Sequence, residues 1–160
     1  MKRIWPYLLA ATIGLLLIAI VGNILNSSAK LVRDITRIAN VRELQTGLEL
    51  RFAQSATYPV APAPIALGQP GTSCLTMEGF EAPCKLGSNQ EVFVRYIVTP
   101  PKGGKSSTSC NDQKPAYCYQ SQGESYQIQF DLVREIESLG LSKGVNCASI
   151  DGLKSGNCKL

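Results

Sequence analysis

Apolar and polar residues follow different patterns along this chain, and the N-terminal part is one unbroken apolar run. No charged residue occurs from Tyr7 to Leu25, where Leu, Ile, Ala and Val dominate. A bilayer core about 30 Å thick needs about 20 such residues in a helix. The run is also longer than the roughly 7–15 residues of a signal-peptide core. We therefore predict a membrane-spanning helix that the protein keeps; the alternative is a secretory signal removed before Lys30.

The residues that flank the run predict its orientation. Lys2 and Arg3 precede it, which favours a cytoplasmic N-terminus, and Trp5 and Tyr7 are placed as interfacial anchors. We expect a single-pass protein of the inner or cell membrane with an extracytoplasmic C-terminal head. Membrane lipid is then its first expected partner, and a cell-surface filament is a further expected location.

A second apolar pattern follows directly, with steps of three and four residues that predict an amphipathic helix. Its stripe comprises Leu31, Ile35, Ile38, Val41, Leu44, Leu48 and Phe52. The charged residues Arg33, Arg37, Glu43, Glu49 and Arg51 lie mostly off this stripe, so we expect them to be solvated. The helix should end near Thr57, because Pro59 disfavours helical geometry in the residue before it.

Strict alternation of apolar and polar residues predicts strands in the C-terminal half. It occurs in "VFVRYIV", residues 92–98, and in "SYQIQFDL", residues 125–132. The segment "AYCYQS", residues 116–121, is expected to form a hairpin with the latter. We predict an α+β fold in which Leu44, Leu48 and Phe52 pack on the sheet formed by residues 92–98 and 125–132. The stripe near Leu31 should stay free to meet neighbouring subunits.

These elements divide the chain into two parts. We expect residues 1–27 to form the transmembrane helix with a short basic leader. We expect residues 28–160 to form the extracytoplasmic head, with the amphipathic helix at 28–57 and disulfide-containing loops and antiparallel sheet at 60–160.

Two stretches resemble bacterial type IV pilins and type II secretion pseudopilins. The first is "IAIVGNILNSSAKLVRDITRIANVRELQTGLELRFAQSATYP", residues 18–59, and the second is "YCYQSQGESYQIQFDLVREIESLGLSKG", residues 117–144. The resemblance implies a pilin-like fold and a structural subunit whose partners are like subunits and the assembly machinery. It also implies that the segment marked by Tyr7, Gly14, Gly22 and Leu25 serves both as membrane anchor and as assembly helix.

The chain departs from that family at its processing site. When Gly22 is matched to the family's mid-helix glycine, Leu8 stands where the pre-cleavage glycine belongs. Ile13 stands where the family has a glutamate. We therefore expect no leader cleavage. The departure favours an alternative function, a single-pass anchored extracytoplasmic binding module that does not polymerise.

The six cysteines all lie in the second half, at Cys74, Cys84, Cys110, Cys118, Cys147 and Cys158. An even number in a loop-rich region behind a membrane segment favours disulfides in an oxidising compartment. Zinc ligation and free thiols are the alternatives, but the chain has no histidine and no C-x-x-C pair. Each successive pair brackets a short loop containing Gly or Pro, so pairing between sequence neighbours is the expected connectivity.

Composition adds little support for other functions. The formal net charge is +4, and the basic residues are scattered, so we predict no nucleic-acid partner. Without histidine, histidine-based catalytic triads and histidine metal sites are excluded. "PPKGG" at 100–104 lacks the frame of a phosphate-binding loop. We predict no enzyme activity, no catalytic residues, no cofactor, no metal and no small-molecule substrate.

Overall fold

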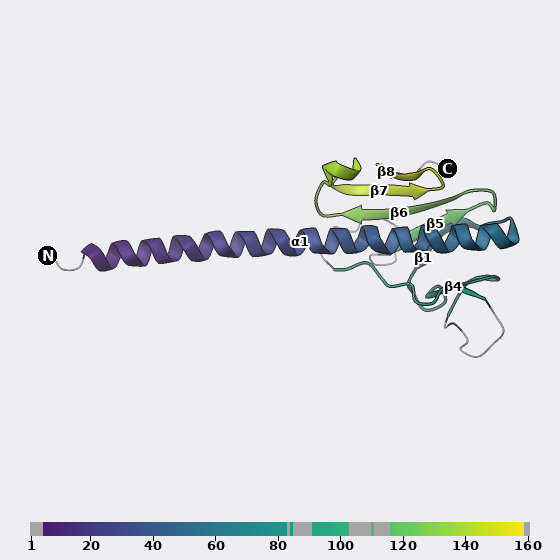
Figure 1. Cartoon of the computed structure of the whole chain (residues 1–160), viewed down its shortest axis with the longest axis horizontal. Helices are drawn as coiled ribbons and strands as arrows, with labels where there is room; N and C mark the ends of the chain where they lie inside the picture. The colour runs from purple at the N-terminus through teal and green to yellow at the C-terminus, as the bar shows by residue number, and fades with distance from the viewer. Residues whose placement is uncertain (1–4, 83, 85–90, 103–109, 111–115, 159–160) are drawn as a thin grey trace.

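One long helix and two small antiparallel sheets make up the fold (Figure 1). The computed structural model describes residues 5–82, 84, 91–102, 110 and 116–158, with side chains from residue 12 onward. Lys2, Arg3 and the side chains of Trp5 and Tyr7 therefore lie outside the described part. Helix α1, Trp5–Ser55, has 51 residues, which corresponds to about 77 Å at the usual helical rise. Its C-terminal half lies along the head, and its N-terminal half projects away from it.

Helix α1 ends at Ser55, two residues before the predicted end. Ala56 adopts a left-handed conformation with φ of 55°, and its N–H donates to the Phe52 carbonyl at 2.7 Å. Arg51 is buried beside this end; its Nε donates to the Met77 carbonyl at 3.0 Å, and Nη1 donates to the Thr57 carbonyl. The expectation that Arg51 is solvated is wrong, because its guanidinium binds the backbone carbonyls of Thr57 and Met77, both of which follow the end of the helix in the chain.

The larger sheet has the strand order β1-β5-β6-β7-β8, and all of its pairs are antiparallel. Its strands are β1 (Ala61–Leu67), β5 (Tyr117–Ser121), β6 (Tyr126–Leu132), β7 (Gly144–Ser149) and β8 (Gly152–Ser155). The predicted hairpin is confirmed, since β5 pairs with β6. The alternation along β6 is also confirmed, because Tyr126, Ile128, Phe130 and Leu132 are all buried.

The smaller sheet corrects the prediction for residues 92–98. It has the order β3-β2-β4, with β2 at Cys74–Thr76, β3 at Gly79–Glu81 and β4 at Val92–Val94. Strand β4 therefore covers only the start of the predicted segment and does not share a sheet with β6. After Val94 the chain leaves the ladder: Ile97 N–H donates to the Ser73 carbonyl at 2.7 Å, and Tyr96 is 70% exposed.

The core lies where helix α1 meets both sheets. Ile38, Val41, Leu44 and Leu48 are buried there, together with aromatic and aliphatic residues of β5 and β6. The helix approaches β4 so closely at Gly47 that a Cβ atom there would collide with Val94 Cγ2. The stripe therefore packs on two sheets rather than on one.

The burial of the stripe divides by depth as predicted, while contact of its exposed part with neighbouring subunits stays a prediction. Leu31 is 41% exposed and Ile35 is 48% exposed, whereas Leu44 and Leu48 are at most 2% exposed. Phe52 is half-buried, and its ring stacks on Tyr58 with centroids 4.5 Å apart.

Four tyrosines cluster in this core or at its edge and resist ionisation there. Burial raises the pKa of Tyr58 to about 12, assisted by the hydrogen bond that its hydroxyl donates to Glu49 at 3.0 Å. Burial also raises the pKa of Tyr117 to about 12, although the bond from Asn40 Nδ2 opposes this shift. The pKa values of Tyr119 and Tyr126 are raised as well, mainly by burial.

We expect the head to lose stability as the pH rises above 10. An unfolded tyrosine ionises near its ordinary pKa of 10.0, whereas folded Tyr58 and Tyr117 ionise near 12. Between these values the folded state binds more protons, so each tyrosine lowers the free energy of unfolding by about 1.4 kcal/mol per pH unit. Urea midpoints measured at increasing pH, with phenolate absorbance recorded in parallel, test this. Tyr117→Phe should make the decline shallower; a midpoint constant up to pH 12 would contradict it.

Candidate functional site: the projecting helix and the base of the head

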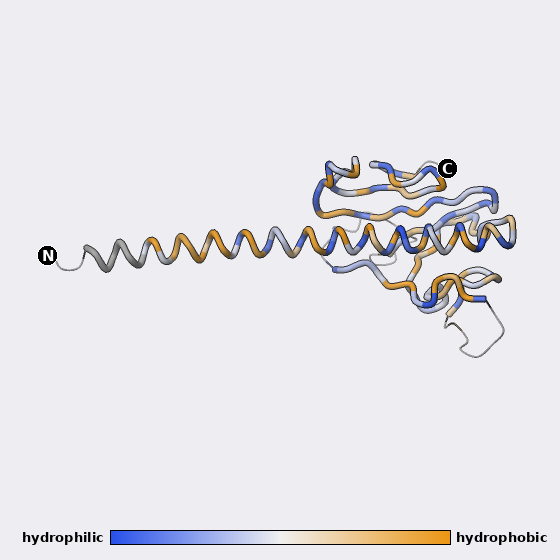
Figure 2. Tube along the Cα trace, in the orientation of Figure 1, coloured by the Kyte–Doolittle hydropathy of each residue, from blue (hydrophilic) through white to orange (hydrophobic). Residues whose placement is uncertain are grey.

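The N-terminal half of helix α1 exposes apolar side chains all around its circumference. Among the most exposed are Leu15, Leu16, Leu17, Ile18, Ile24 and Leu25, each more than half exposed. A Cβ atom added at Gly14 or Gly22 would meet no atom within 4 Å. Figure 2 shows the largely hydrophobic colouring of this projecting part. The described helix is long and apolar enough to cross a membrane.

Polar side chains on the exposed helix bind its own backbone. Asn23 Nδ2 donates to the Ala19 carbonyl at 3.0 Å, and Thr36 Oγ1 donates to the Val32 carbonyl at 2.9 Å. Such local bonds reduce the cost of placing a polar group in lipid, because the group keeps a hydrogen-bond partner. Asn23 is thus compatible with an apolar environment.

The head is fixed to the helix by a buried acidic residue that the sequence analysis did not identify. Asp34 is fully buried, and its Oδ1 lies 2.6 Å from Arg37 Nη1. The same carboxylate accepts the backbone N–H groups of Val133 and Arg134, each at 2.9 Å. Arg37 Nη2 donates in turn to the Pro101 carbonyl at 2.5 Å. One ion pair therefore joins the helix to the chain after β6 and to the loop after β4.

The burial of Arg37 overturns the expectation that this residue is solvated; it is 2% exposed. In the sequence, Asp34 and Arg37 are only an oppositely charged pair three residues apart beside the apolar stripe. Such pairs more often lie on solvated helix faces. Only the position of residues 133 and 134, about a hundred residues later in the chain, distinguishes the two cases.

The base of the head meets the helix at Ser27. Arg134 Nη1 donates to the Ser27 carbonyl at 3.2 Å and lies 2.9 Å from Ser27 Oγ. Beside this contact is an open hollow of about 680 Å³. Its lining comes from the helix (Asn23, Asn26, Ser27 and Lys30) and from the head (Leu132, Val133, Arg134 and Lys143).

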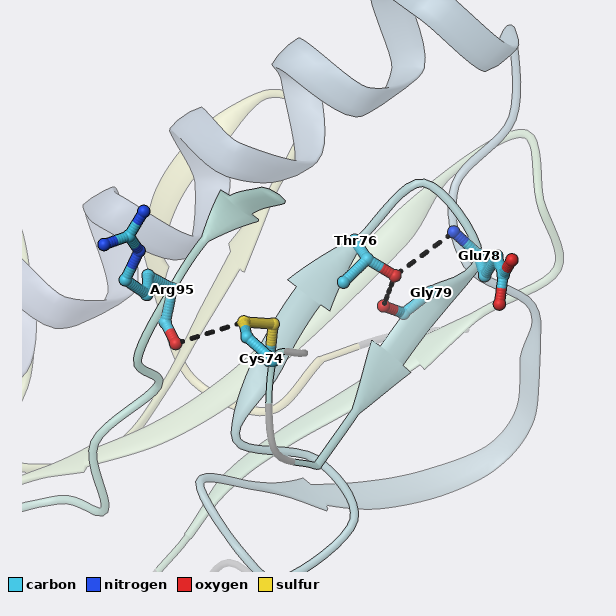
Figure 3. The surroundings of a disulfide bond; sticks show 6 residues. Cys74, Thr76, Glu78, Gly79 and Arg95 are labelled. Carbon is cyan, nitrogen blue, oxygen red and sulfur yellow. Dashed lines mark hydrogen bonds between the residues drawn. A yellow bond between two sulfur atoms is a disulfide. The ribbon is translucent and has the colours of Figure 1, made fainter. Parts of the chain in front are cut away.

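Three disulfides stabilise the head, and the predicted pairing between sequence neighbours is confirmed. Cys74 is bonded to Cys84, Cys110 to Cys118, and Cys147 to Cys158. In Figure 3 the first of these lies next to Arg95, whose carbonyl oxygen is 3.3 Å from the Cys84 sulfur. Closing a loop of this length contributes somewhat less than about 3 kcal/mol in the chain-entropy model.

The same region is ordered by local polar bonds (Figure 3). Thr76 Oγ1 accepts the Glu78 N–H at 3.2 Å and lies 3.3 Å from the Gly79 carbonyl oxygen, in the turn between β2 and β3. Gly79 has φ of 127°, which favours glycine at this turn. The small sheet thus combines a tight turn with a disulfide that joins β2 to the chain after β3.

No group of three or more His, Cys, Asp or Glu side chains that could hold a metal ion occurs among the described residues. The described cysteines are all in disulfides, so none offers a thiolate for ligation or attack. The described residues do provide an exposed apolar helix surface and a hollow lined by basic side chains at the base of the head.

Comparison with protein-family models, with curated proteins and with solved structures found no match to this chain.

Proposed function

We propose that the chain is a pilin-like or pseudopilin-like structural subunit, anchored in a membrane and able to assemble into a filament of the type IV pilus or type II secretion kind. The observation that carries this proposal is one continuous helix with two environments. Its C-terminal half forms part of the core of the head, and its N-terminal half exposes apolar residues around its whole circumference.

An apolar helix of this length requires a cover of lipid or of other apolar helices. A helix that is hydrophobic on all sides is characteristic of a membrane span or of the interior of a large assembly. In a filament subunit, lipid covers the apolar helix before assembly, and the helices of like subunits cover it afterwards. The sequence resemblance of residues 18–59 to pilins supports the same use of the helix.

The part of the exposed helix that lies next to the head favours assembly over simple anchoring. Leu31, Val32 and Ile35 follow the charge-free run, yet they are 41%, 64% and 48% exposed. Clustered exposed apolar residues outside lipid commonly mark a protein interface. We propose that the helix of a second subunit covers these three side chains.

The head is proposed to face an oxidising compartment outside the cytoplasm. Three disulfides in a small, loop-rich head are typical of extracytoplasmic proteins, because cytosolic thiols are kept reduced. With Lys2 and Arg3 on the cytoplasmic side, the chain would cross the membrane once. We propose a structural role without catalysis, since the chain has no histidine and its cysteines are consumed in disulfides.

A non-polymerising anchored module is the second candidate function. It is favoured by Ile13, which is 59% exposed where the family's glutamate would stand, and by Leu8 in place of the pre-cleavage glycine. Such a module would use the same helix for anchoring only.

Site-specific photo-cross-linking in the native membrane distinguishes the two. A cross-linker at Leu16 or at Val32 should give a ladder of homomultimers, because both positions would face like helices in a filament. The same cross-linker at Lys154, which is exposed on β8, serves as the matched control and should give little multimer. Monomers alone at Leu16 and Val32, in cells that carry the assembly machinery, would reject the filament and leave the anchored module.

A further inference from the structure

The hollow at the base of the head is lined by cations from two separate parts of the chain. Lys30 comes from helix α1, Arg134 follows β6, and Lys143 precedes β7. None of the described residues that line the hollow is acidic, and Asp34, the nearby buried carboxylate, is already paired with Arg37. The lining therefore carries a formal charge of +3, with no acidic side chain among its described residues to balance it. A concave surface of this kind concentrates anions.

Arg134 is held in place before any ligand arrives. Its Nη1 is bonded to Ser27, and its backbone N–H to Asp34. A guanidinium that is already oriented loses less conformational freedom on binding and can present two parallel donors to a phosphate. Lys30 and Lys143 add flexible cationic groups at the sides. One oriented guanidinium and two ammonium groups that converge on the same hollow match a phosphate group better than scattered surface lysines would.

The depth of the hollow relative to the proposed membrane span identifies the source of that phosphate. This step rests on the proposed function, in which Tyr7–Leu25 occupies the hydrocarbon core. Lys30 lies five residues beyond Leu25, about 7.5 Å along the helix axis. The polar headgroup layer on each side of a bilayer is roughly 5–8 Å thick. Lys30 thus lies at headgroup level, while Asn23, which also lines the hollow, lies within the span.

We propose that this hollow binds the phosphodiester headgroup of an anionic phospholipid in the leaflet below the head. The phosphate lies between Arg134, Lys30 and Lys143, and the amide and hydroxyl groups of Asn26 and Ser27 face the polar part of the glycerol. Leu132 and Val133 close the hollow on the side of the head. A lipid held at this position fixes the height and tilt of the head above the membrane.

Native mass spectrometry of the full-length protein tests the proposal. The protein is extracted in a neutral detergent, and equal amounts of phosphatidylglycerol and phosphatidylcholine are added. Wild type should retain phosphatidylglycerol in preference to phosphatidylcholine. A basic residue near an anionic membrane surface contributes about a fivefold gain in binding. The variant Lys30→Gln/Arg134→Gln/Lys143→Gln should therefore lose affinity on the order of a hundredfold if the three contributions add.

Two further variants keep the result interpretable. Arg42→Gln/Arg95→Gln/Lys154→Gln removes the same charge from exposed positions of the head and should retain the lipid. Lys30→Gln/Lys143→Gln leaves the Arg134–Ser27 contact intact, so it weakens binding without disturbing the junction, which an unchanged melting temperature verifies.

Three results would contradict lipid binding at the hollow. Equal retention of the two lipids, or equal losses in the two triple variants, would overturn it. Displacement of phosphatidylglycerol by millimolar inorganic phosphate would also overturn it, because the hollow would then be a site for the free ion. Reconstitution into vesicles distinguishes absence of the lipid site from failure of the proposed function. A chain that does not float with the vesicles lacks the membrane anchor. A chain that floats but shows no lipid preference lacks only the lipid site.

Discussion

Replacing Asp34 by alanine is expected to lower the free energy of unfolding by about 3–5 kcal/mol, the usual effect of removing one partner of a buried ion pair. The carboxylate is fully buried and accepts Arg37 Nη1 and the backbone N–H groups of Val133 and Arg134. Its loss leaves a buried guanidinium without its counter-charge and two backbone donors without an acceptor. Urea denaturation of a soluble head beginning at Asn26 measures the change.

Two comparisons show whether the effect comes from the ion pair. Arg33→Ala, one residue away on the exposed side of the helix, should change stability by less than about 0.5 kcal/mol. Asp34→Ala/Arg37→Met should recover part of the loss, because it removes the unpaired buried charge. An Asp34→Ala variant as stable as Arg33→Ala would contradict the role given to this residue.

Leu48→Ala is expected to destabilise the head by about 2–5 kcal/mol, because it leaves a cavity where helix α1 meets the sheets. Leu48 is completely buried in the main core, one residue after the close approach of Gly47 to β4. The melting temperature of the same soluble head reports the loss.

Leu31→Ala is the matched control, since it makes the same chemical change in the same helix. Leu31 is 41% exposed, and we expect its truncation to change the melting temperature little. In the native membrane, Leu31→Ala should have the larger effect of the two variants on cross-linking between subunits. Equal destabilisation of the soluble head by both variants would refute the division of the stripe by depth.

Features with a strong local period could be predicted from the sequence. The helix and the buried part of its stripe follow steps of three and four residues, and β6 alternates strictly because one of its faces packs on the core. Disulfide pairing was also predictable, since each loop is short and can turn back at Gly or Pro. In these cases the local pattern and the tertiary packing require the same arrangement.

Features that depend on distant partners were missed or misassigned. The alternation of residues 92–98 continues past Val94, but ladder pairing stops there, and the Ile97 N–H donates instead to the Ser73 carbonyl outside the strand. Strand β1 contains Pro62 and Pro64, which obscure a strand and are tolerated because β1 lies at the edge of its sheet. Strands β7 and β8 were not predicted either.

The missed parts of the candidate site share the same cause. Asp34, Arg37 and Arg51 are ordinary charged helix residues until the head supplies carbonyl and N–H partners. The hollow at the base of the head likewise requires Lys30 to meet Arg134 and Lys143, which are more than a hundred residues away in the sequence. Local hydrophobic periodicity does not predict contacts between residues so far apart in the sequence.

We propose that the native protein keeps its apolar helix as the anchor of a disulfide-bonded head outside the cytoplasm. Mass spectrometry of the protein extracted from its native membrane, intact and after non-reducing digestion, tests it most directly. We predict that the segment Tyr7–Leu25 remains part of the chain and that the pairs Cys74–Cys84, Cys110–Cys118 and Cys147–Cys158 are oxidised. A native chain that begins at Lys30, or one that carries these cysteines as free thiols, would contradict the account.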